Sequence, residues 1–400
     1  MLYRKSVCSS VLLLGALMVV RLAAGSLSLG ANFNEHLTVA RVPALDLTGV
    51  QWIRGFLPAG EFLDVPRPVP LGAGERRQLA TDPGVAAFRA AAASGRKVAV
   101  TLKWDFKRTH WRVPVPDSAD EQKAFAWALE VVQVMHPDLL LLVNELFIDT
   151  EEADLAPGPD GVVPMVRFLQ RLAAHVAASR LKAPDGSPMM VSCGGFTRLD
   201  LPATRKQAAT KALLPWLATT PNLTHVNFHL HQQSLAQFEQ AVKFMHAQMP
   251  QRPFVVTEFS LVWAFKQGMR EKLGATAVGR RFAEQFHCPP GQTVAAYLSA
   301  AAKTPVSEAE LHAFLASRPW FDPQGLEKMC GFMEQNGVVL ATFAYLQASS
   351  GLERPQAPVG EAQPPWRLNP VFQERHAFVP NSDRLAVNLE YFDTFVHRQR

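Results

Sequence analysis

Residues 139–145 read LLLLVNE, and residues 254–259 read FVVTEF. Each stretch is a short apolar run that leads into a glutamate, Glu145 in the first and Glu258 in the second. A carboxylate at the end of an otherwise buried strand costs free energy unless it has a partner or a function. The two stretches therefore predict buried strands, each of which presents a functional carboxylate at its carboxyl end.

Six further apolar runs have a similar length and composition, and most are apolar on both faces, as in parallel strands that are buried on both sides. They cover residues 27–34, 50–56, 97–104, 189–193, 225–231 and 338–345. Amphipathic helical stretches lie between the runs, at residues 82–94, 118–135, 163–179, 207–218, 234–248 and 323–335. Strands that alternate with helices predict an α/β fold with right-handed crossovers.

The number of runs, eight, favours a closed (β/α)8 TIM barrel over an open doubly wound sheet. No Gly-rich phosphate loop follows the first run, which argues against a nucleotide-binding fold. We expect residues 26–400 to form a single domain. Within it, residues 261–320 would be a long helical insertion or cap after the seventh strand, and residues 348–400 a C-terminal extension on the barrel exterior. A connection as long as 261–320 at the active face predicts a wall of the site.

The first 25 residues have the layout of a secretory signal peptide. Arg4 and Lys5 precede an apolar stretch at residues 11–20, and small residues follow. The alternative, a membrane anchor, is weaker because the apolar stretch is short and Arg21 interrupts it. We expect cleavage and a secreted or periplasmic protein with no stable membrane insertion.

Charge and cysteine content limit the partners. The net charge is +5, but the 40 Lys and Arg residues are scattered, which does not predict a nucleic-acid partner.

Three cysteines follow the predicted signal peptide: Cys193, Cys288 and Cys330. They allow one internal disulfide with a free thiol, or three unpaired cysteines. The oligomeric state is not predicted.

Glu145 and Glu258 end the fourth and seventh strands, which face each other across the mouth of a barrel. Two facing carboxylates are the minimum apparatus for glycoside hydrolysis. The pair Asn144-Glu145 and Glu258 resemble the large clan of retaining glycoside hydrolases that are built on (β/α)8 barrels. The resemblance implies that Glu145 is the acid/base, that Asn144 holds the sugar 2-hydroxyl, and that Glu258 is the nucleophile.

The resemblance extends to two other strands. Arg54 matches an arginine that is often found beside the nucleophile at the end of strand two. His229-Leu230-His231 resembles the His-x-Tyr of strand six, with His231 in place of the tyrosine. Leu146 stands where proline is common, and strand eight offers Tyr345 where tryptophan is frequent. These departures leave the individual family, the sugar and the choice of endo or exo cleavage unassigned.

Other polar and aromatic residues at strand ends are candidates for substrate binding. Asn34 and Glu35 end the first run, and Tyr345 ends the eighth. Trp104 and Asp105 end the third. Trp104 either stacks on a sugar ring or packs in the core, and both roles stay open.

We therefore predict an exported retaining enzyme that cleaves β-glycosidic bonds in oligo- or polysaccharides, with no metal or organic cofactor. One alternative is a carbohydrate-binding barrel that has lost turnover. Another is a metal-dependent hydrolase, because His225, His229 and His231 alternate along one strand and would share a face.

Overall fold

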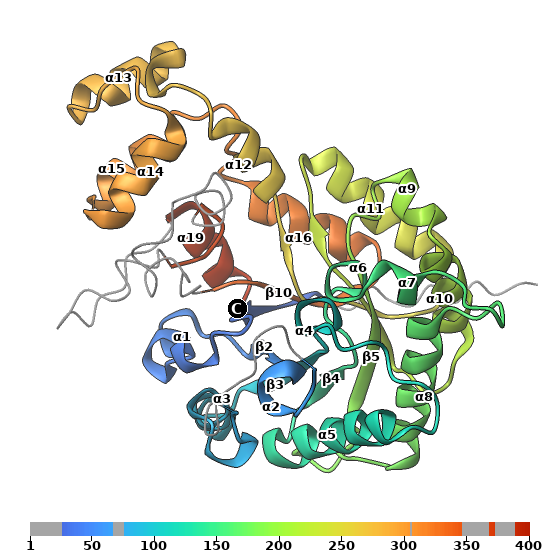
Figure 1. Ribbon diagram of the computed structural model, residues 1–400. Helices are drawn as coiled ribbons and strands as arrows, with labels where there is room; N and C mark the ends of the chain where they lie inside the picture. The colour runs from blue at the N-terminus through green and yellow to red at the C-terminus, as the bar shows by residue number, and fades with distance from the viewer. Residues whose placement is uncertain (1–25, 67–75, 305, 346–367, 373–388) are drawn as a thin grey trace, which may run out of the picture.

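The computed structural model describes residues 26–66, 76–304, 306–345, 368–372 and 389–400, and within them eight parallel strands form a closed barrel (Figure 1). The order around the barrel is β1, β10, β8, β6, β5, β4, β3 and β2. The bounds are β1 (Ser28–Asn32), β2 (Trp52–Pro58), β3 (Lys97–Lys103), β4 (Leu139–Leu141), β5 (Met190–Phe196), β6 (His225–Phe228), β8 (Phe254–Val256) and β10 (Val338–Ala344). Every predicted apolar run overlaps one of these strands, although β2 and β5 extend two and three residues beyond their runs, so the predicted (β/α)8 barrel is confirmed.

The barrel closes between its first and last strands. β1 pairs with β10 over five residues, from Ser28 beside Leu340 to Asn32 beside Ala344. Two short strands, β7 (Leu230–His231) and β9 (Phe259–Ser260), pair with each other beyond the ends of β6 and β8. Strand β7 extends the course of β6, and β9 extends the course of β8, beyond the mouth of the barrel.

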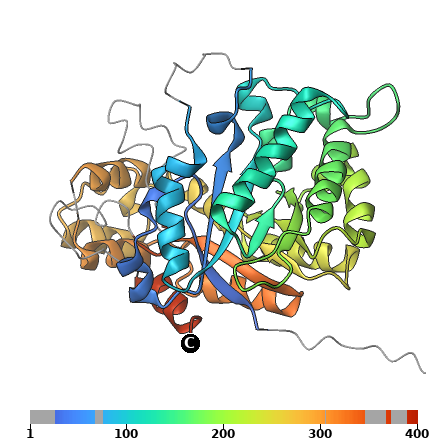
Figure 2. The ribbon, with the colours of Figure 1, turned by 90° about the horizontal axis from the view of Figure 1, so that it is seen from below.

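Helices surround the barrel, as the view from below shows (Figure 2). The longer ones are α1 (Val42–Thr48), α3 (Pro83–Ala93), α5 (Ala119–Met135), α8 (Pro164–Ala178), α10 (Ala208–Thr219), α11 (Leu235–Gln248) and α16 (Gly325–Gln335). Short helices and turns at the connections are η1 (Leu37–Val39), α2 (Ala59–Phe62), η2 (Leu79–Thr81), α4 (Phe106–Thr109), α6 (Leu146–Asp149), α7 (Glu152–Leu155) and α9 (Pro202–Lys206).

Side-chain caps fix where several helices begin. The Asp82 carboxylate accepts a hydrogen bond from Val85 N at 2.9 Å, with Pro83 as the first helical residue of α3. Ser118 and Ser234 cap α5 and α11 in the same way. Each cap satisfies a backbone N–H that the helix itself leaves unpaired.

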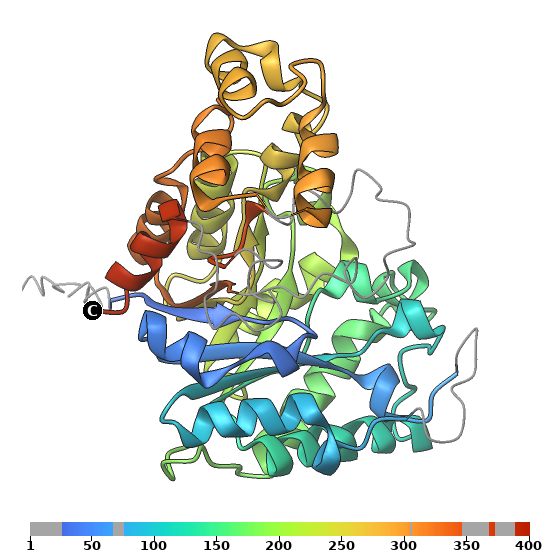
Figure 3. The same ribbon diagram turned by 90° about the vertical axis from the view of Figure 1, so that its left-hand side faces the viewer.

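The segment after β9 folds into helices of its own. They are α12 (Val262–Gly268), η3 (Leu273–Ala275), α13 (Ala277–Gln285), α14 (Val294–Lys303) and α15 (Glu308–Ala316). Helices α13, α14 and α15 form a group beyond the barrel wall (Figure 1 and Figure 3). The rings of Phe282, Tyr297 and Phe314 pack together, with centroids 4.7–5.8 Å apart. They belong to the same continuous apolar core as the barrel.

The described end of the C-terminal segment packs on the barrel exterior. Helix α19 (Leu389–His397) contacts α1 and α16. Its Tyr391 ring lies 5.6 Å from that of Phe343 in β10, and Arg398 Nη1 donates to Glu334 in α16 at 2.7 Å. The predicted signal peptide, residues 1–25, lies outside the described residues.

Cys193, Cys288 and Cys330 are free thiols, which selects the second of the two cysteine patterns that we considered. Burial raises the pKa of Cys193 and of Cys330 to about 12, so both behave as apolar core residues. Among the described helices, none has the length and apolar character needed to span a bilayer.

Candidate active site

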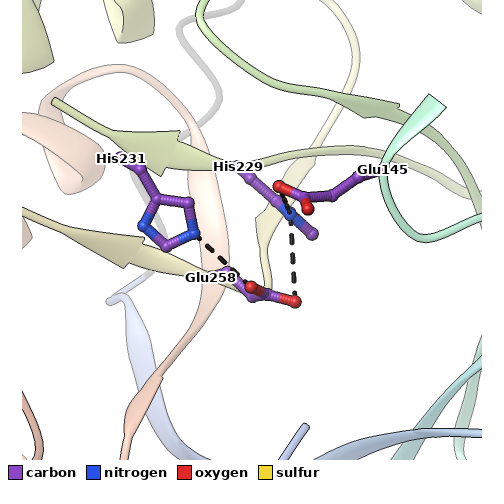
Figure 4. Close-up of side chains that lie close together, drawn as sticks. All are labelled: Glu145, His229, His231 and Glu258. Carbon is purple, nitrogen blue, oxygen red and sulfur yellow. Dashed lines mark hydrogen bonds and ion pairs between the residues drawn. The ribbon is translucent and has the colours of Figure 1, made fainter. Parts of the chain in front are cut away.

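Glu145 and Glu258 meet at the mouth of the barrel. Glu145 follows β4 and precedes α6, and Glu258 lies between β8 and β9. The two carboxylates lie at the centre of the cluster in Figure 4, and an oxygen of one lies within 4.8 Å of an oxygen of the other. The side chains are only 15% and 12% exposed. Convergence of two nearly buried carboxylates is the arrangement that the sequence predicted; their catalytic roles remain predictions.

Arg54 in β2 organises the floor of this site. The guanidinium is fully buried, and Nη1 donates to Glu258 Oε1 at 2.7 Å. Nη2 donates to Asn144 Oδ1 at 2.8 Å, and Nε donates to Thr101 Oγ1 at 3.0 Å. Nη1 also reaches Asn34 Oδ1 at 3.1 Å. One planar cation therefore orients the predicted nucleophile and the predicted sugar ligand Asn144 together.

Asp149, a residue that the sequence reading missed, fixes the other side of Asn144. Its Oδ2 accepts from Asn144 Nδ2 at 3.3 Å and from Glu145 N at 3.2 Å. Burial raises the pKa of Asp149 to about 6, although Lys103, 3.9 Å away, opposes the shift. In the sequence, the indication of this role was the spacing alone: Asp149 is an aspartate four residues after Glu145, on the turn that follows the fourth strand.

His229 contacts Glu145 through one ring nitrogen and Thr257 through the other. The Thr257 hydroxyl donates to Asn227 Oδ1 at 3.0 Å, so its oxygen accepts from His229 Nε2, also at 3.0 Å. Nε2 therefore carries hydrogen, and Nδ1 faces Glu145 Oε1 at 3.3 Å (Figure 4). A hydrogen bond across that contact needs one more proton, on either the ring nitrogen or the carboxyl group. His229 therefore lies within hydrogen-bond distance of the predicted acid/base residue.

His231 contacts the other carboxylate. Its Nδ1 lies 2.7 Å from Ser260 Oγ, and its Nε2 lies 3.4 Å from Glu258 Oε2 (Figure 4). Burial alone would raise the pKa of Glu258, but the charges of His229 and Arg54 and the bond from His231 outweigh it and hold that pKa well below its usual range. Glu258 is therefore ionised, as a nucleophile must be.

Two glycines let β5 approach its neighbours at this level. Gly194 and Gly195 have φ of 138° and 59°. A Cβ on Gly194 would lie 2.2 Å from Asn227 O, and one on Gly195 would lie 2.3 Å from Asn144 O. Only glycine fits both positions. The register between β5 and β6 shifts at this point, between Gly194 and Phe196.

A pocket of about 500 Å³ opens at these residues. Five predicted site residues line it: Asn34, Asn144, Glu145, His231 and Glu258. Arg54 and His229 lie beneath them and act through contacts with the carboxylates. Further lining residues that the sequence reading did not assign to the site include Lys103, Phe147, Ile148, Leu201 and Trp263.

Three predicted substrate-binding residues are buried outside the pocket, and these assignments need correction. Trp104 is 1% exposed and packs among aromatic rings, with Nε1 donating to Leu142 O at 2.8 Å, so it belongs to the core. Asp105 is buried and binds Arg108 at 2.5 Å. Tyr345 is buried, and its hydroxyl bonds to Thr48 in α1, which lies on the barrel exterior. Glu35 is exposed next to the lining residue Asn34, and its charge contributes to raising the pKa of Lys103, which lines the pocket, so its assignment stays a prediction.

The predicted metal site of three histidines is wrong, because one of its three residues lies far from the other two. His225 begins β6, at the opposite end of the strand from the mouth, and its Nδ1 lies 2.8 Å from Thr224 Oγ1. Of the described residues, Glu145, His229, His231 and Glu258 do offer donor atoms within 4.8 Å of one another and are the group that could hold a metal. A divalent cation there would lie beside the buried Arg54 guanidinium, which opposes its binding electrostatically.

Solved structures similar to this chain are glycoside hydrolases. An exo-β-1,4-mannosidase from Opitutaceae bacterium strain TAV5 is 14% identical with a TM-score of 0.48; the match covers 94% of this chain and 60%, less than two thirds, of that one. A glycoside hydrolase family 10 protein from Paenibacillus barcinonensis is 14% identical with a TM-score of 0.49, covering 93% and 94% of the two chains.

The GH53 catalytic domain from Ignisphaera aggregans is also 14% identical, with a TM-score of 0.44 and coverage of 92% and 91%. No protein-family model matches the chain, and neither does any curated protein. The resemblance inferred from Asn144, Glu145 and Glu258 names the same class of protein. At this level of identity the similarity concerns the fold, and no residue role is transferred from these neighbours.

We expect acid to weaken the fold partly through Glu258. Its folded-state pKa lies below the ordinary value of 4.5, so ionisation contributes stability that is fully present above that value. As the pH falls, the unfolded chain takes up a proton first, and this stability is lost. Urea unfolding at pH 7 and pH 4 should show that Glu258→Gln costs less free energy at the lower pH. The exposed Glu152→Gln is the control, and an equal cost of Glu258→Gln at both pH values would contradict the assignment.

Proposed function

We propose that this protein is a retaining glycoside hydrolase that cleaves β-glycosidic bonds by double displacement. The observation that carries the proposal is the separation of Glu145 and Glu258, whose nearest oxygens lie within 4.8 Å. Retaining enzymes place the two carboxyl groups about 5–5.5 Å apart, whereas inverting enzymes leave about 6.5–9.5 Å for a water molecule. The short separation supports direct attack by one carboxylate.

Each glutamate has an environment that suits one role. Glu258, held ionised by Arg54 and the histidines, attacks the anomeric carbon and forms a glycosyl-enzyme. Glu145, which lies 3.3 Å from His229 Nδ1, protonates the departing oxygen and then takes a proton from the water that releases the sugar. The proton that leaves in the first step is thereby restored in the second.

The proposal includes export and a polysaccharide or oligosaccharide substrate. The basic and apolar layout of residues 1–25 supports a signal peptide and a secreted or periplasmic enzyme. The pocket is open to solvent at the carboxyl ends of the barrel strands, where TIM-barrel enzymes bind their substrates.

The test is hydrolysis of a panel of aryl β-glycosides and β-linked oligosaccharides after dialysis against EDTA, with the first anomer of the product identified by proton NMR. We expect the β-anomer to appear first and the chelator to have no effect. An α-anomer first would mean inversion. Activity that EDTA removes and zinc restores would support the metal-dependent hydrolase. Binding without turnover would support the inactive carbohydrate-binding barrel.

A further inference from the structure

Arg198 stands at the start of the loop that follows β5, and it lines the pocket. Its φ of 54° lies in the left-handed region, which residues that carry a side chain rarely adopt. A tight turn follows, in which Leu201 N donates to Arg198 O at 3.0 Å. Backbone conformations of this kind cost free energy and concentrate at functional sites, so Arg198 is a candidate for a role in the pocket.

A buried carboxylate fixes the Arg198 guanidinium. Nε and Nη2 each donate to one oxygen of Asp200, both at 3.0 Å, and the Asp200 side chain is only 1% exposed. With its amide nitrogen facing Asp200, the fully buried Gln232 donates to the same two oxygens, at 2.9 and 3.3 Å. An arginine that is held by two parallel bonds is already ordered, so it loses little further entropy when it binds a ligand.

Part of the guanidinium is left for such a ligand. Nη1 takes no part in the pair with Asp200, and among the described residues no oxygen accepts a hydrogen bond from it. The Arg198 side chain is 22% exposed at the pocket. Because Asp200 balances the charge, the remaining N–H groups act as hydrogen-bond donors to neutral oxygens more than as an anion site.

The wall that carries Arg198 is mixed in character. Thr204 on α9 and Gln207 after it line the pocket together with Arg198, and so do Leu201 and Trp263. Guanidinium, hydroxyl and amide groups beside aliphatic and aromatic surface suit a sugar ring, which has apolar C–H faces and hydroxyl groups at its edge. A simple apolar alcohol would satisfy none of the polar groups, and covering them without a partner costs free energy.

This wall lies beside the residue that protonates the leaving oxygen in the proposed mechanism. That residue, Glu145, follows β4, and β5 is the next strand around the barrel. Arg54 lies in β2, three strands from β5, and binds Glu258 and Asn144, which contact the reacting sugar in that mechanism. With the reacting sugar on the Arg54 side, the leaving group extends from Glu145 toward Arg198.

We propose that Arg198 is a specificity-determining residue that donates hydrogen bonds to hydroxyl oxygens of a leaving-group sugar, with Asp200 and Gln232 as positioning residues. The preferred substrates are then β-linked disaccharides and oligosaccharides, ahead of β-glycosides of simple alcohols. This inference rests on the proposed glycosidase function and adds the leaving group and the residue that recognises it.

The experiment measures one ratio, namely kcat/KM for a β-linked disaccharide of the sugar that the panel identifies, divided by kcat/KM for its methyl β-glycoside. A general loss of activity or of folded enzyme cancels in this ratio, whereas a lost contact with the second sugar lowers it. We expect Arg198→Met to lower the ratio about tenfold, the effect of losing one hydrogen bond from a charged donor. Asp200→Asn should also lower the ratio, because the guanidinium is no longer held by two charged bonds.

A double variant separates positioning from a structural role. If Asp200 acts through Arg198, adding Asp200→Asn to Arg198→Met should leave the ratio within about twofold of the single Arg198 variant, and a further fall would contradict the positioning role. Arg167→Met is the matched control. It removes another arginine–aspartate pair, with Asp160, from outside the pocket, and should leave the ratio at the wild-type value.

A ratio in Arg198→Met within twofold of wild type would overturn the inference, as would cleavage of methyl or aryl glycosides but of no disaccharide. Both results leave the glycosidase function intact. If no glycoside is cleaved, the proposed function fails, and calorimetry with the panel disaccharides and the matching methyl glycosides decides the inference. It then requires a disaccharide that binds more tightly than its methyl glycoside, and a loss of about tenfold in that difference in Arg198→Met. Absence of disaccharide binding would overturn it.

Discussion

Replacing Glu258 by glutamine should lower kcat on every glycoside by on the order of 10⁴-fold or more, whatever its leaving group. The amide is neutral and cannot attack the anomeric carbon. It also leaves the positive charge that develops on the sugar without a facing anion. Because Arg54 keeps its bonds to Asn144 and Thr101 in the variant, the barrel mouth should remain assembled.

Two measurements check this expectation. The first is kcat for dinitrophenyl and alkyl glycosides of the same sugar, which should fall together. The second is mass spectrometry of the wild-type protein after reaction with a 2-deoxy-2-fluoro glycoside that carries a good leaving group. One glycosyl unit should attach to the peptide that contains Glu258, and none should attach to Glu258→Gln. Labelling of another carboxylate, or a variant that retains turnover within tenfold, would remove Glu258 from the role of nucleophile.

The positions of the barrel strands were predictable because parallel strands buried on both faces form continuous apolar runs. The locations of Glu145 and Glu258 followed from the same property, since a charge at the end of such a run is conspicuous. Arg54 stands out for a related reason: it is a cation inside an apolar run, and only a bonded cation is tolerated there.

The direction of individual side chains was not predictable in the same way. A run that is apolar on both faces does not show which residues point into the barrel, so Trp104 and Tyr345 could not be assigned to the core from the sequence. Spacing along a strand misled the interpretation of His225. It shares the periodicity of His231, but six residues at about 3.3 Å each place it roughly 20 Å away along the strand.

Asp149 and the pocket residues Leu201 and Trp263 were missed because their positions depend on how loops fold. Leu201 and Trp263 are distant in sequence and meet only because their loops leave neighbouring parts of the barrel mouth. Asp149 acts through the folded turn that brings its carboxylate back to Asn144 and to the Glu145 backbone. The Gly194-Gly195 pair was the one local signal that β5 passes close to other backbones.

Replacing Glu145 by alanine should produce losses that depend on the leaving group. An alkoxide must be protonated as it leaves, so kcat on alkyl glycosides should fall by about 10²–10⁴-fold, the usual contribution of a general acid. A dinitrophenolate leaves without a proton, so formation of the glycosyl-enzyme from that substrate should be little affected. Release of the sugar then becomes slow, because no base activates water, and a burst of dinitrophenol should precede a slow steady state.

External azide should restore the second step, since it attacks the glycosyl-enzyme without needing a base and can enter the space vacated by the carboxylate. The expected product is the β-glycosyl azide, and its formation should accelerate dinitrophenol release in the steady state. Glu151→Ala, on the same segment of chain after β4, provides a control that should show neither effect. The leaving-group dependence separates a catalytic from a structural role, because a distorted site would lose activity on all substrates alike. Equal losses on alkyl and dinitrophenyl glycosides, with no response to azide, would assign the proton transfer to another group, and His229, at 3.3 Å from Glu145, would be the next to test.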